Sequence, residues 1–423
     1  MESVGVGLLG LGTVGTEVAR RLIDEWELLG ERAGATPVLR VVAVRDVARP
    51  RDVGLKNVRL VADAHAVVAD PAVAIVVEVM GGTDPATALI ESSLRAGKSV
   101  VTANKAVIAA SGPRLSAVAA EHGARLYFEA SVGGGLPIVA LLRGSLLGDR
   151  ISALDCVING TTNIILTQMR AAGVSFAHAL VEAQRRGFAE ADPSLDVDGW
   201  DAAHKLVILA WLAFGAHVAS EAVDRVGIRD VAGDDVAALA ELGYRVRLLA
   251  HAGLAAGGAV HLSVRPTAVG AGHLLHDVDD ADNAVIISSD LAATVTVRGL
   301  GGGGASTASA VVSDVVTAVR ERGARPEPIA AARADVPRLG DEDVEIRGYV
   351  RVRLSAEADA RALVLQALED RGLAVDAAVD VAGSELIVLT GIAPRAVHDR
   401  ALETLDTLTS VDRILGALDR VEA

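Results

Sequence analysis

Five carboxylates and a lysine stand close together in the stretch from Ala183 to Lys205. The acidic side chains there are Glu190, Asp192, Asp196, Asp198 and Asp201. Lys205 follows Asp201 by four residues, so the two side chains share a face if this segment is helical. Lys205 also opens an apolar run, LVILAWLAFG, which is typical of a buried helix. A lysine at the edge of such a helix, beside a loop of carboxylates, predicts a binding site for a small substrate with an ammonium group. The lysine would be the acid/base next to that substrate.

An ordinary ion pair is the alternative interpretation of Asp201 and Lys205. Pairs spaced four apart on a solvated helix stabilise it by only about 0.3–0.5 kcal/mol and need no functional explanation. The other motifs of the chain must decide between the two interpretations.

A glycine-rich turn near the N-terminus predicts dinucleotide binding. The apolar run from Val4 to Leu9 leads directly into GLGTVG, and a helical pattern follows. Such glycines permit a tight turn, close approach to a pyrophosphate and close packing of helix on strand, while the first N–H groups of the helix bind phosphate. We therefore expect the cofactor to be bound by Gly10, Gly12, Thr13, Val14 and Gly15.

The residue that follows the second predicted strand bears on the choice between NAD and NADP. Arg45 stands directly after the strand from Leu39 to Val44, and arginine suits a 2′-phosphate. Asp46 comes next, and an acidic residue at this place binds the ribose of NAD. The sequence favours NADP and leaves NAD open.

The next two strands place a lysine near the ligand. The run from Ala74 to Met80 reads as a buried parallel strand with an isolated Glu78, which we expect to be a hydrogen-bonded structural carboxylate. The strand that begins at Ser99 ends in the turn TANK, which carries Thr102 and Lys105. Loops at the carboxyl ends of parallel strands face the ligand, so both residues are predicted to lie near cofactor or substrate. A surface lysine is the alternative.

Two further glycine clusters follow predicted secondary structure. A strand over Arg125–Ala130, ending in Glu129, runs into SVGGGLP, where exposed main-chain groups suit an ion or a cofactor. The segment RGLGGGGAS, which contains Gly302, precedes a predicted helix near residues 305–325. Gly302 is therefore a further candidate for cofactor binding.

Composition excludes several classes of partner. The chain of 423 residues has 40 Lys and Arg against 55 Asp and Glu, a net charge of −15, which argues against nucleic acid and anionic membranes. Aromatic residues are only 2%, too few for base-stacking platforms. Its one cysteine, Cys156, allows no internal disulfide and permits a reducing compartment. Because neither a signal peptide nor a membrane span is recognisable, we expect a cytoplasmic protein.

The order of predicted elements indicates an α/β protein of three parts. We expect a dinucleotide-binding domain at residues 1–135, to which the helix near 305–325 returns, and a central α+β domain at 136–325. A linker is predicted at 326–344. Residues 345–423 then show a βαββαβ pattern, typical of a small α+β sandwich.

Taken together, these motifs resemble the homoserine dehydrogenase family over essentially the whole chain. The resemblance rests on the stretch from Ala183 to Lys205 and on GLGTVG, TANK, EASVGGGLPI, NGTTN and TASAVVSD, in the expected order. It implies reduction of L-aspartate 4-semialdehyde to L-homoserine with NAD(P)H, and the reverse reaction, in threonine, methionine and isoleucine biosynthesis. It also implies a Rossmann-like N-terminal domain, a central catalytic and dimerisation domain, a C-terminal ACT-like domain, and a homodimer or higher homo-oligomer.

The resemblance assigns roles to individual residues. It implies that Lys205 is the acid/base at the substrate oxygen, that Lys105 lies beside nicotinamide and substrate, and that Glu190 binds the substrate ammonium. Asp196 and Asp201 would hold substrate and lysine in place. A monovalent cation such as Na⁺ would be bound by Glu129 with the main chain of Val132, Gly134 and Leu136.

Two other functions stay open at this point. A phosphorylating semialdehyde dehydrogenase needs a cysteine nucleophile, and Cys156 lies in an apolar strand pattern. A non-catalytic nucleotide- or amino-acid-binding regulator would not need Lys105, Lys205 and the carboxylates together.

The ACT-like module departs from the family pattern in one loop. Effector-binding ACT modules usually carry an acidic residue and a glycine between the first strand and the first helix. The segment from Leu354 to Leu363 has neither Pro nor Gly. We therefore expect a degraded effector site and weak or absent inhibition by L-threonine.

Overall fold

The computed structural model describes residues 2–326, 329, 332–333 and 336–422. The chain divides into two compact units, each assembled from separate stretches of sequence. Unit 1 comprises Met1–Ile151, His204–Ala222 and Asn283–Asp335, and unit 2 comprises Ser152–Ala203, Val223–Asp282 and Val336–Ala423. Residues 327, 328, 330, 331, 334 and 335 of the expected linker lie outside the described residues, and the domain boundaries stay a prediction.

Unit 1 is built on a six-stranded parallel sheet. Its strands are β1 (Ser3–Leu9), β2 (Thr36–Ala43), β3 (Arg59–Val61), β4 (Ile75–Glu78), β5 (Ser99–Thr102) and β6 (Leu126–Tyr127). They lie in the order β3-β2-β1-β4-β5-β6, and every pairing is parallel. The direction of strand addition reverses between β1 and β4. Ligands bind at this switch point in open α/β sheets, which confirms the expected dinucleotide-binding topology.

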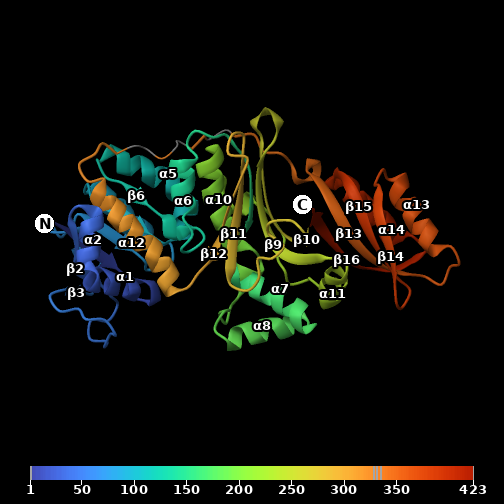
Figure 1. Ribbon diagram of the computed structural model, residues 1–423, viewed down its shortest axis with the longest axis horizontal. Helices are drawn as coiled ribbons and strands as arrows, with labels where there is room; N and C mark the ends of the chain where they lie inside the picture. Colours follow the sequence, from blue (N-terminus) through green and yellow to red (C-terminus); the bar gives the residue numbers. More distant parts are fainter. Residues whose placement is uncertain (1, 327–328, 330–331, 334–335, 423) are drawn as a thin grey trace. The chain divides into compact units, whose positions relative to one another are not determined.

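Helices from both ends of the sequence cover this sheet. They are α1 (Thr13–Asp24), α2 (Trp26–Ala33), α3 (His65–Val68), α4 (Ala86–Arg95), α5 (Lys105–Glu121) and α12 (Gly304–Arg320). Figure 1 shows α12 beside α1 and α2, although some 280 residues separate α12 from α1 in sequence. Val311 and Val315 of α12 share one buried core with Val18 and Leu22 of α1. The core is formed mostly by Ala, Val and Leu, with Tyr127 as its one aromatic residue among those described, as expected from the scarcity of aromatic residues.

The segment after β6 differs from the sequence prediction. Only Leu126–Tyr127 pair as a strand, and Glu129 lies in a one-turn 3₁₀ helix, Glu129–Ser131. A short helix α6 (Ile138–Ala140) and a π turn (Leu141–Ser145) follow. The predicted strand over Arg125–Ala130 was therefore too long, because the Glu129 side chain turns back to α6 instead of continuing the sheet. Strands β11 (Asp282–Ser289) and β12 (Thr294–Leu300) form a hairpin before α12.

Unit 2 contains a mixed sheet in the order β7-β9-β10-β16-β13-β15-β14, with β8 beside β10. Its first strands are β7 (Ile151–Val157), β8 (Asp224–Arg225), β9 (Tyr244–Leu254) and β10 (Val260–Gly270). The long antiparallel pair β9–β10 falls in a stretch where the sequence analysis expected no elements.

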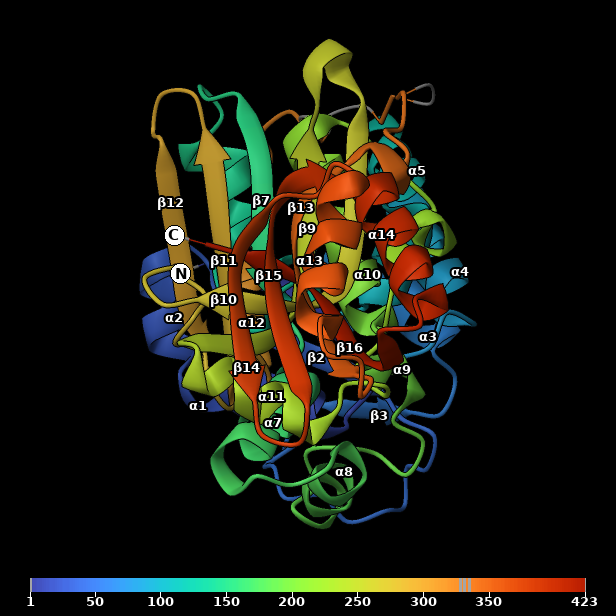
Figure 2. The same ribbon diagram turned by 90° about the vertical axis from the view of Figure 1, so that its right-hand side faces the viewer.

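The C-terminal part of unit 2 has the predicted βαββαβ order. Its elements are β13 (Glu345–Leu354), α13 (Ala360–Asp370), β14 (Val375–Val381), β15 (Glu385–Pro394), α14 (Arg395–Thr407) and β16 (Val411–Val421). Both helices pack on one face of the four strands, as Figure 2 shows, through Val364, Leu368, Ala401 and Leu405. Residues Asp419 to Val421 of β16 also pair with β10, so this module and the rest of unit 2 share one sheet.

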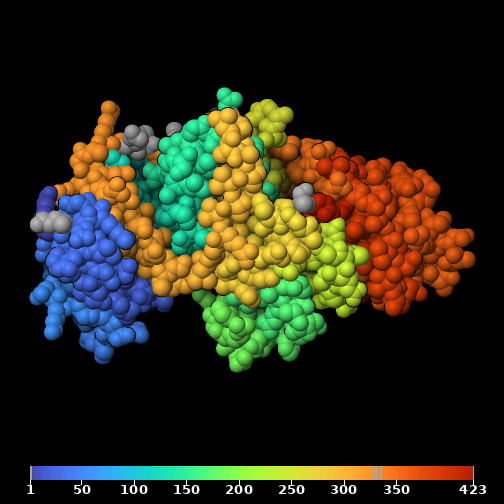
Figure 3. All heavy atoms as spheres, viewed as in Figure 1, coloured from blue at the N-terminus to red at the C-terminus, as the bar shows by residue number. Residues whose placement is uncertain are grey.

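The helices α7 (Gly160–Ala172), α8 (Phe176–Arg185), α9 (Ser194–Val197) and α11 (Gly233–Glu241) also belong to unit 2. Figure 3 shows α7 and α8 in green at the molecular surface, and α8 buries only Ala179 and Ala183. Helix α10 (Trp200–Phe214) begins in unit 2 and continues into unit 1. Among the described helices none alone is long and apolar enough to cross a membrane, and α7 with α8 meets that test only as a pair bent by 120°.

Candidate functional site

The three glycines of the GLGTVG turn have three different environments. Gly10 has φ +99°, in the left-handed region that favours glycine. A Cβ on Gly15 would lie 2.3 Å from the carbonyl oxygen of Gly10, so this glycine lets α1 pack closely on β1. A Cβ on Gly12 would meet nothing within 4 Å. Space is therefore left above Gly12 at the N-terminus of α1, where N–H groups attract a pyrophosphate.

Arg45 is exposed just beyond the end of β2, next to the switch point. The Asp46 carboxylate accepts a hydrogen bond from the N–H of Ala48 at 2.9 Å, and its carbonyl oxygen accepts one from Arg51. Asp46 thus shapes the turn with its own acceptor groups, whereas the Arg45 side chain extends from the surface. An exposed guanidinium at this position can bind a phosphate.

Buried Glu78 holds the turn that carries Lys105. Its carboxylate accepts hydrogen bonds from the Met80 N–H (2.8 Å) and the Thr102 hydroxyl (2.6 Å). The Thr102 hydroxyl oxygen in turn accepts the N–H of Asn104 (3.0 Å), and the Asn104 side chain caps α5. Glu78 is the hydrogen-bonded structural carboxylate expected from its isolation in an apolar strand. It fixes the carboxyl end of β5, and Lys105 begins α5 directly after this turn.

The two later glycine clusters meet in space. A Cβ on Gly134 would lie 2.6 Å from the carbonyl oxygen of Gly301, and a Cβ on Gly135 would lie 2.5 Å from the Ser306 hydroxyl. A Cβ on Gly304 would lie 2.7 Å from the methyl group of Thr13, which begins α1. The segment that holds Gly302 therefore packs between the loop after β6 and the dinucleotide turn.

The Glu129 carboxylate lies against the start of α6. Its carboxylate accepts hydrogen bonds from the N–H groups of Val139 (2.8 Å) and Ala140 (2.6 Å) at the start of α6. Burial raises the pKa of this carboxyl group, and the N–H groups of α6 act in the opposite direction. The cation site expected at Glu129 with main-chain groups of Val132, Gly134 and Leu136 stays a prediction.

In unit 2, the structure brings two of the predicted substrate carboxylates together. The Asn159 amide donates to Asp196 Oδ1 at 2.7 Å and to Asp201 Oδ2 at 2.9 Å. Asp196 lies in α9, and Asp201 lies in the first turn of α10 with a side chain only 5% exposed. Asn159 was not among the predicted site residues. Its signal in the sequence was the pattern of an asparagine cap before a helix.

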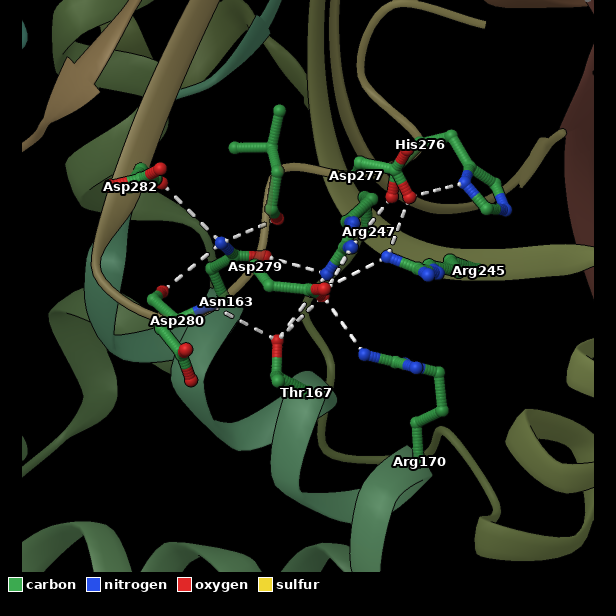
Figure 4. Close-up of polar contacts among 11 residues, drawn as sticks. Asn163, Thr167, Arg170, Arg245, Arg247, His276, Asp277, Asp279, Asp280 and Asp282 are labelled. Atoms are coloured by element: carbon green, nitrogen blue, oxygen red, sulfur yellow. Dashed lines mark hydrogen bonds and ion pairs between the residues drawn. The ribbon is translucent and has the colours of Figure 1, made fainter. Parts of the chain in front are cut away.

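A polar network anchors α7, the helix that Asn159 caps. Asn163 donates to the carbonyl oxygens of Val278 (2.8 Å) and Asp280 (3.1 Å) and accepts from buried Arg247 (3.0 Å). Figure 4 shows these contacts around Asp279, which also pairs with three arginines: Arg170, Arg245 and Arg247. These arginines keep the pKa of Asp279 low against the opposing effect of burial. The network fixes the first turn of α7.

The remaining acidic residues are more peripheral. Glu190 is exposed, and the Asp192 carboxylate accepts from the N–H and hydroxyl of Ser194. Asp198 pairs with Arg229. Lys205 is half-buried on α10, one turn beyond Asp201, at the start of a segment whose next six residues are buried. The predicted helix and the spacing of Asp201 and Lys205 on it are thus present.

Neither a cysteine nucleophile nor a metal site at the described residues finds much support. Cys156 is fully buried in β7, and burial raises the pKa of its thiol well above the usual value, so it is a poor nucleophile. Among the described residues, Asp224, His261 and Asp341 lie close enough to hold a metal ion. Asp341 already pairs with Arg265 and Arg395, which supply positive charge there. We interpret the cluster as an ion-pair network.

Two family models match this chain. A family model described as "Homoserine dehydrogenase, NAD binding domain" matches residues 10–129. A second model, "Homoserine dehydrogenase", matches residues 137–316.

Individual homoserine dehydrogenases are similar to this chain over most of its length. A homoserine dehydrogenase of Corynebacterium glutamicum is 37% identical over 96% of this chain and 92% of its own length. The crystal structure of one from Thiobacillus denitrificans superposes with a TM-score of 0.93 at 37% identity, covering 100% of this chain and 99% of the other. A hyperthermophilic archaeal homoserine dehydrogenase in complex with NADPH is 30% identical, with a TM-score of 0.62 over 75% of this chain and 97% of its own.

Proposed function

Because this chain belongs to the homoserine dehydrogenase family, we propose that Lys205 and the carboxylates held by Asn159 act on the substrate of that enzyme. The chain is an NAD(P)-dependent oxidoreductase that acts on a CH–OH group. It interconverts L-aspartate 4-semialdehyde and L-homoserine in the biosynthesis of threonine, methionine and isoleucine. What the proposal adds is the part played by each residue.

Reduction of the aldehyde needs a proton at the carbonyl oxygen. The bound cofactor supplies the hydride. Lys205 gives the proton and takes it back in the reverse direction, since an ammonium at the edge of a buried helix is a suitable general acid. Asp201, one turn away on α10, orients the lysine, and Asp196 binds the substrate. The observation that carries this proposal is the placement of buried Asp201 and half-buried Lys205 on one turn of α10.

The substrate ammonium is assigned to Glu190. This side chain is exposed in the loop between α8 and α9, so it can accept the ammonium group without a buried charge in the absence of substrate. Lys105 is assigned to the nicotinamide and the reacting carbon. Its support is the position directly after the turn that Glu78 and Thr102 hold at the carboxyl end of β5.

NADP is the proposed cofactor, with NAD as the alternative. The turn of Gly10, Gly12, Thr13, Val14 and Gly15 takes the pyrophosphate, and Arg45 takes the 2′-phosphate. Gly302 and the turn that buried Thr102 holds complete the cofactor site. The NADPH complex of the archaeal relative supports this choice by analogy.

Four further proposals rest on the family. A monovalent cation such as Na⁺ is bound by Glu129 with main-chain groups of Val132, Gly134 and Leu136. The chain forms a homodimer through the central domain and works in the cytoplasm. Its C-terminal βαββαβ module is an ACT-like domain with a degraded effector site.

The activity is tested by following the absorbance of the reduced nicotinamide with purified protein, homoserine and NADP or NAD. The expected result is homoserine-dependent reduction of the cofactor, faster with NADP. The assay should be repeated in sodium and in a large organic cation such as tetramethylammonium. No reduction of either cofactor over a broad pH range would contradict the proposed activity. Equal rates in both salts would contradict the proposed monovalent-cation site.

A further inference from the structure

Asn159 stands where β7 ends and α7 begins, and its two amide atoms have separate partners. Its Oδ1 accepts the N–H of Thr162 at 2.8 Å, which caps α7, and also the Thr162 hydroxyl at 2.8 Å. Its Nδ2 donates to Asp196 and Asp201 at 2.7 and 2.9 Å. The side chain is 4% exposed, so all four contacts are shielded from water.

The capping contact fixes which way the amide faces. A helix cap requires an acceptor toward the Thr162 N–H, so Oδ1 must lie on that side and the NH₂ group on the other. If the amide were turned over, its oxygen would face two carboxylates and its NH₂ would face an N–H donor. The network therefore permits one orientation, in which each amide hydrogen meets one carboxylate.

A neutral group that donates two hydrogen bonds, such as the Asn159 NH₂, is well suited to a position between two carboxylates. Like charges this close repel each other and raise the affinity of the pair for a proton. The amide lowers that repulsion without adding a charge, whereas an arginine or lysine here would form an ion pair and compete with Lys205 or the substrate ammonium. Asn159 thus fixes the orientation of Asp196 and Asp201 relative to each other.

We propose that Asn159 is a positioning residue of the reaction, which holds the carboxylates of Asp196 and Asp201 in the geometry that substrate and Lys205 need. The inference rests on the proposed roles of those two carboxylates. Its own support is the double donation from one buried amide whose orientation is set by an independent cap. The polar network of Asn163, Arg247 and Asp279 adds to it, because it immobilises the turn on which Asn159 sits.

The replacement Asn159→Asp separates positioning from capping. Aspartate caps a helix as well as asparagine does, but both N–H donors are lost and a third carboxylate joins the pair. We expect kcat to fall roughly tenfold or more at pH 8. At lower pH the three carboxylates share a proton, which restores a donor. The deficit relative to wild type should therefore shrink by at least about threefold between pH 8 and pH 6.

Two further variants make the test decisive. Asn159→Ser keeps a capping oxygen and adds no charge, so it covers the case in which Asn159→Asp does not fold; its deficit should not depend on pH. Ser175→Asp adds a carboxylate at the cap of α8, where Ser175 accepts the His178 N–H, and should keep wild-type kcat at both pH values. Circular dichroism and thermal unfolding confirm that each variant is folded.

The outcomes distinguish this inference from the roles on which it rests. Wild-type kcat and KM in folded Asn159→Ser or Asn159→Asp would overturn it, and so would an Asn159→Asp deficit that is the same at pH 6 and pH 8. Asp196→Asn and Asp201→Asn are measured alongside. If those two variants keep full activity, the proposed roles of the carboxylates are wrong, whatever Asn159 does.

Discussion

The Asp314 carboxylate accepts a hydrogen bond from the backbone N–H of Glu129 at 2.9 Å, which joins the middle of α12 to the turn after β6. Burial raises the pKa of Asp314 to about 7. The Glu129 N–H opposes this shift, and the nearby Glu129 carboxylate adds to it. In the folded protein Asp314 therefore holds a proton in a pH range where an ordinary aspartate has lost it.

Asp314→Asn should stabilise the protein at alkaline pH. The folded state binds more protons than the unfolded state between pH ~4 and ~7, so the wild-type free energy of unfolding falls as pH rises through that window. Asparagine can still accept the Glu129 N–H and carries no charge. The gain should be near zero at pH 4 and reach about 1–4 kcal/mol at pH 8, measured by urea unfolding.

Asp412→Asn is the matched control, since Asp412 is exposed on β16 and its replacement makes the same charge change. It should leave the pH dependence of unfolding unaltered. An Asp314→Asn variant that is less stable than wild type at pH 8 would show that the ionised carboxylate is needed in the fold.

This contact also marks a limit of what sequence reveals. EASVGGGLPI was recognised as a site segment, yet the partners of Glu129 are the start of α6 and Asp314, which lies 185 residues further along the chain. A carboxylate before a glycine cluster looks like a cation ligand when its partners are unknown. Its contact with the start of α6 depends on the tertiary fold, and the sequence alone does not show it.

Gly12→Ala should weaken cofactor binding without unfolding the protein. The added methyl group would meet no protein atom within 4 Å, and Gly12 does not have a positive φ. The methyl group would instead occupy the space proposed for the pyrophosphate. We expect KM for NADP to rise roughly tenfold or more, with KM for homoserine nearly unchanged.

Gly54→Ala is the control for this variant, because a Cβ on Gly54 also meets nothing within 4 Å. It should behave as wild type in kinetics. An unchanged KM for NADP in Gly12→Ala would mean that the pyrophosphate does not approach this glycine.

Lys205→Ala tests the general acid. Alanine is a good helix former, so α10 should persist, while the proton donor is lost. We expect kcat to fall by roughly 10²-fold or more with little change in KM for NADP. Lys56→Ala, at an exposed position of unit 1, serves as control. Turnover close to wild type in Lys205→Ala would refute the assignment.

Arg45→Ala tests whether Arg45 binds the 2′-phosphate of NADP. Removal of the guanidinium should raise KM for NADP roughly tenfold and change KM for NAD little, because only NADP carries that phosphate. Arg32→Ala, which removes an exposed arginine at the end of α2, should change neither value. If the ratio of the two KM values stays constant in Arg45→Ala, another residue selects the cofactor.

Much of unit 1 was predictable because local signals specify it. Short apolar strands end in glycine or in TANK, and the order of strands and helices alone indicated a parallel sheet. The pair β9–β10 was missed although its alternating arginines, such as Arg245 and Arg247, suggest strands. Asn159 shows why contacts between distant residues could not be predicted. Its cap was visible as NGTT, but its two donations join residues 37 and 42 positions away, which only the folded chain brings together.

The loop between β13 and α13 is the basis for the last prediction, weak inhibition by threonine. The N–H of Ser355 donates to the carbonyl oxygen of Ser410 at 3.0 Å, and the Glu357 carboxylate accepts from the Ser410 hydroxyl at 2.5 Å. The loop is thus bound to the start of β16, and α13 begins only at Ala360. The loop has no glycine, and the Glu357 carboxylate is already bound to Ser410. Both features argue against close approach of an amino acid to this backbone.

We expect L-threonine to inhibit the full-length enzyme weakly or not at all. The measurement is a threonine titration of homoserine oxidation at saturating NADP, with L-serine and D-threonine as controls for non-specific effects. Truncation after Asp343 is an unsuitable control, because β16 pairs with β10 and its loss would damage the sheet of unit 2. Glu357→Ala in the whole chain is better, since it removes only the contact with Ser410. Strong inhibition at sub-millimolar threonine that this variant abolishes would show that the loop is a working effector site.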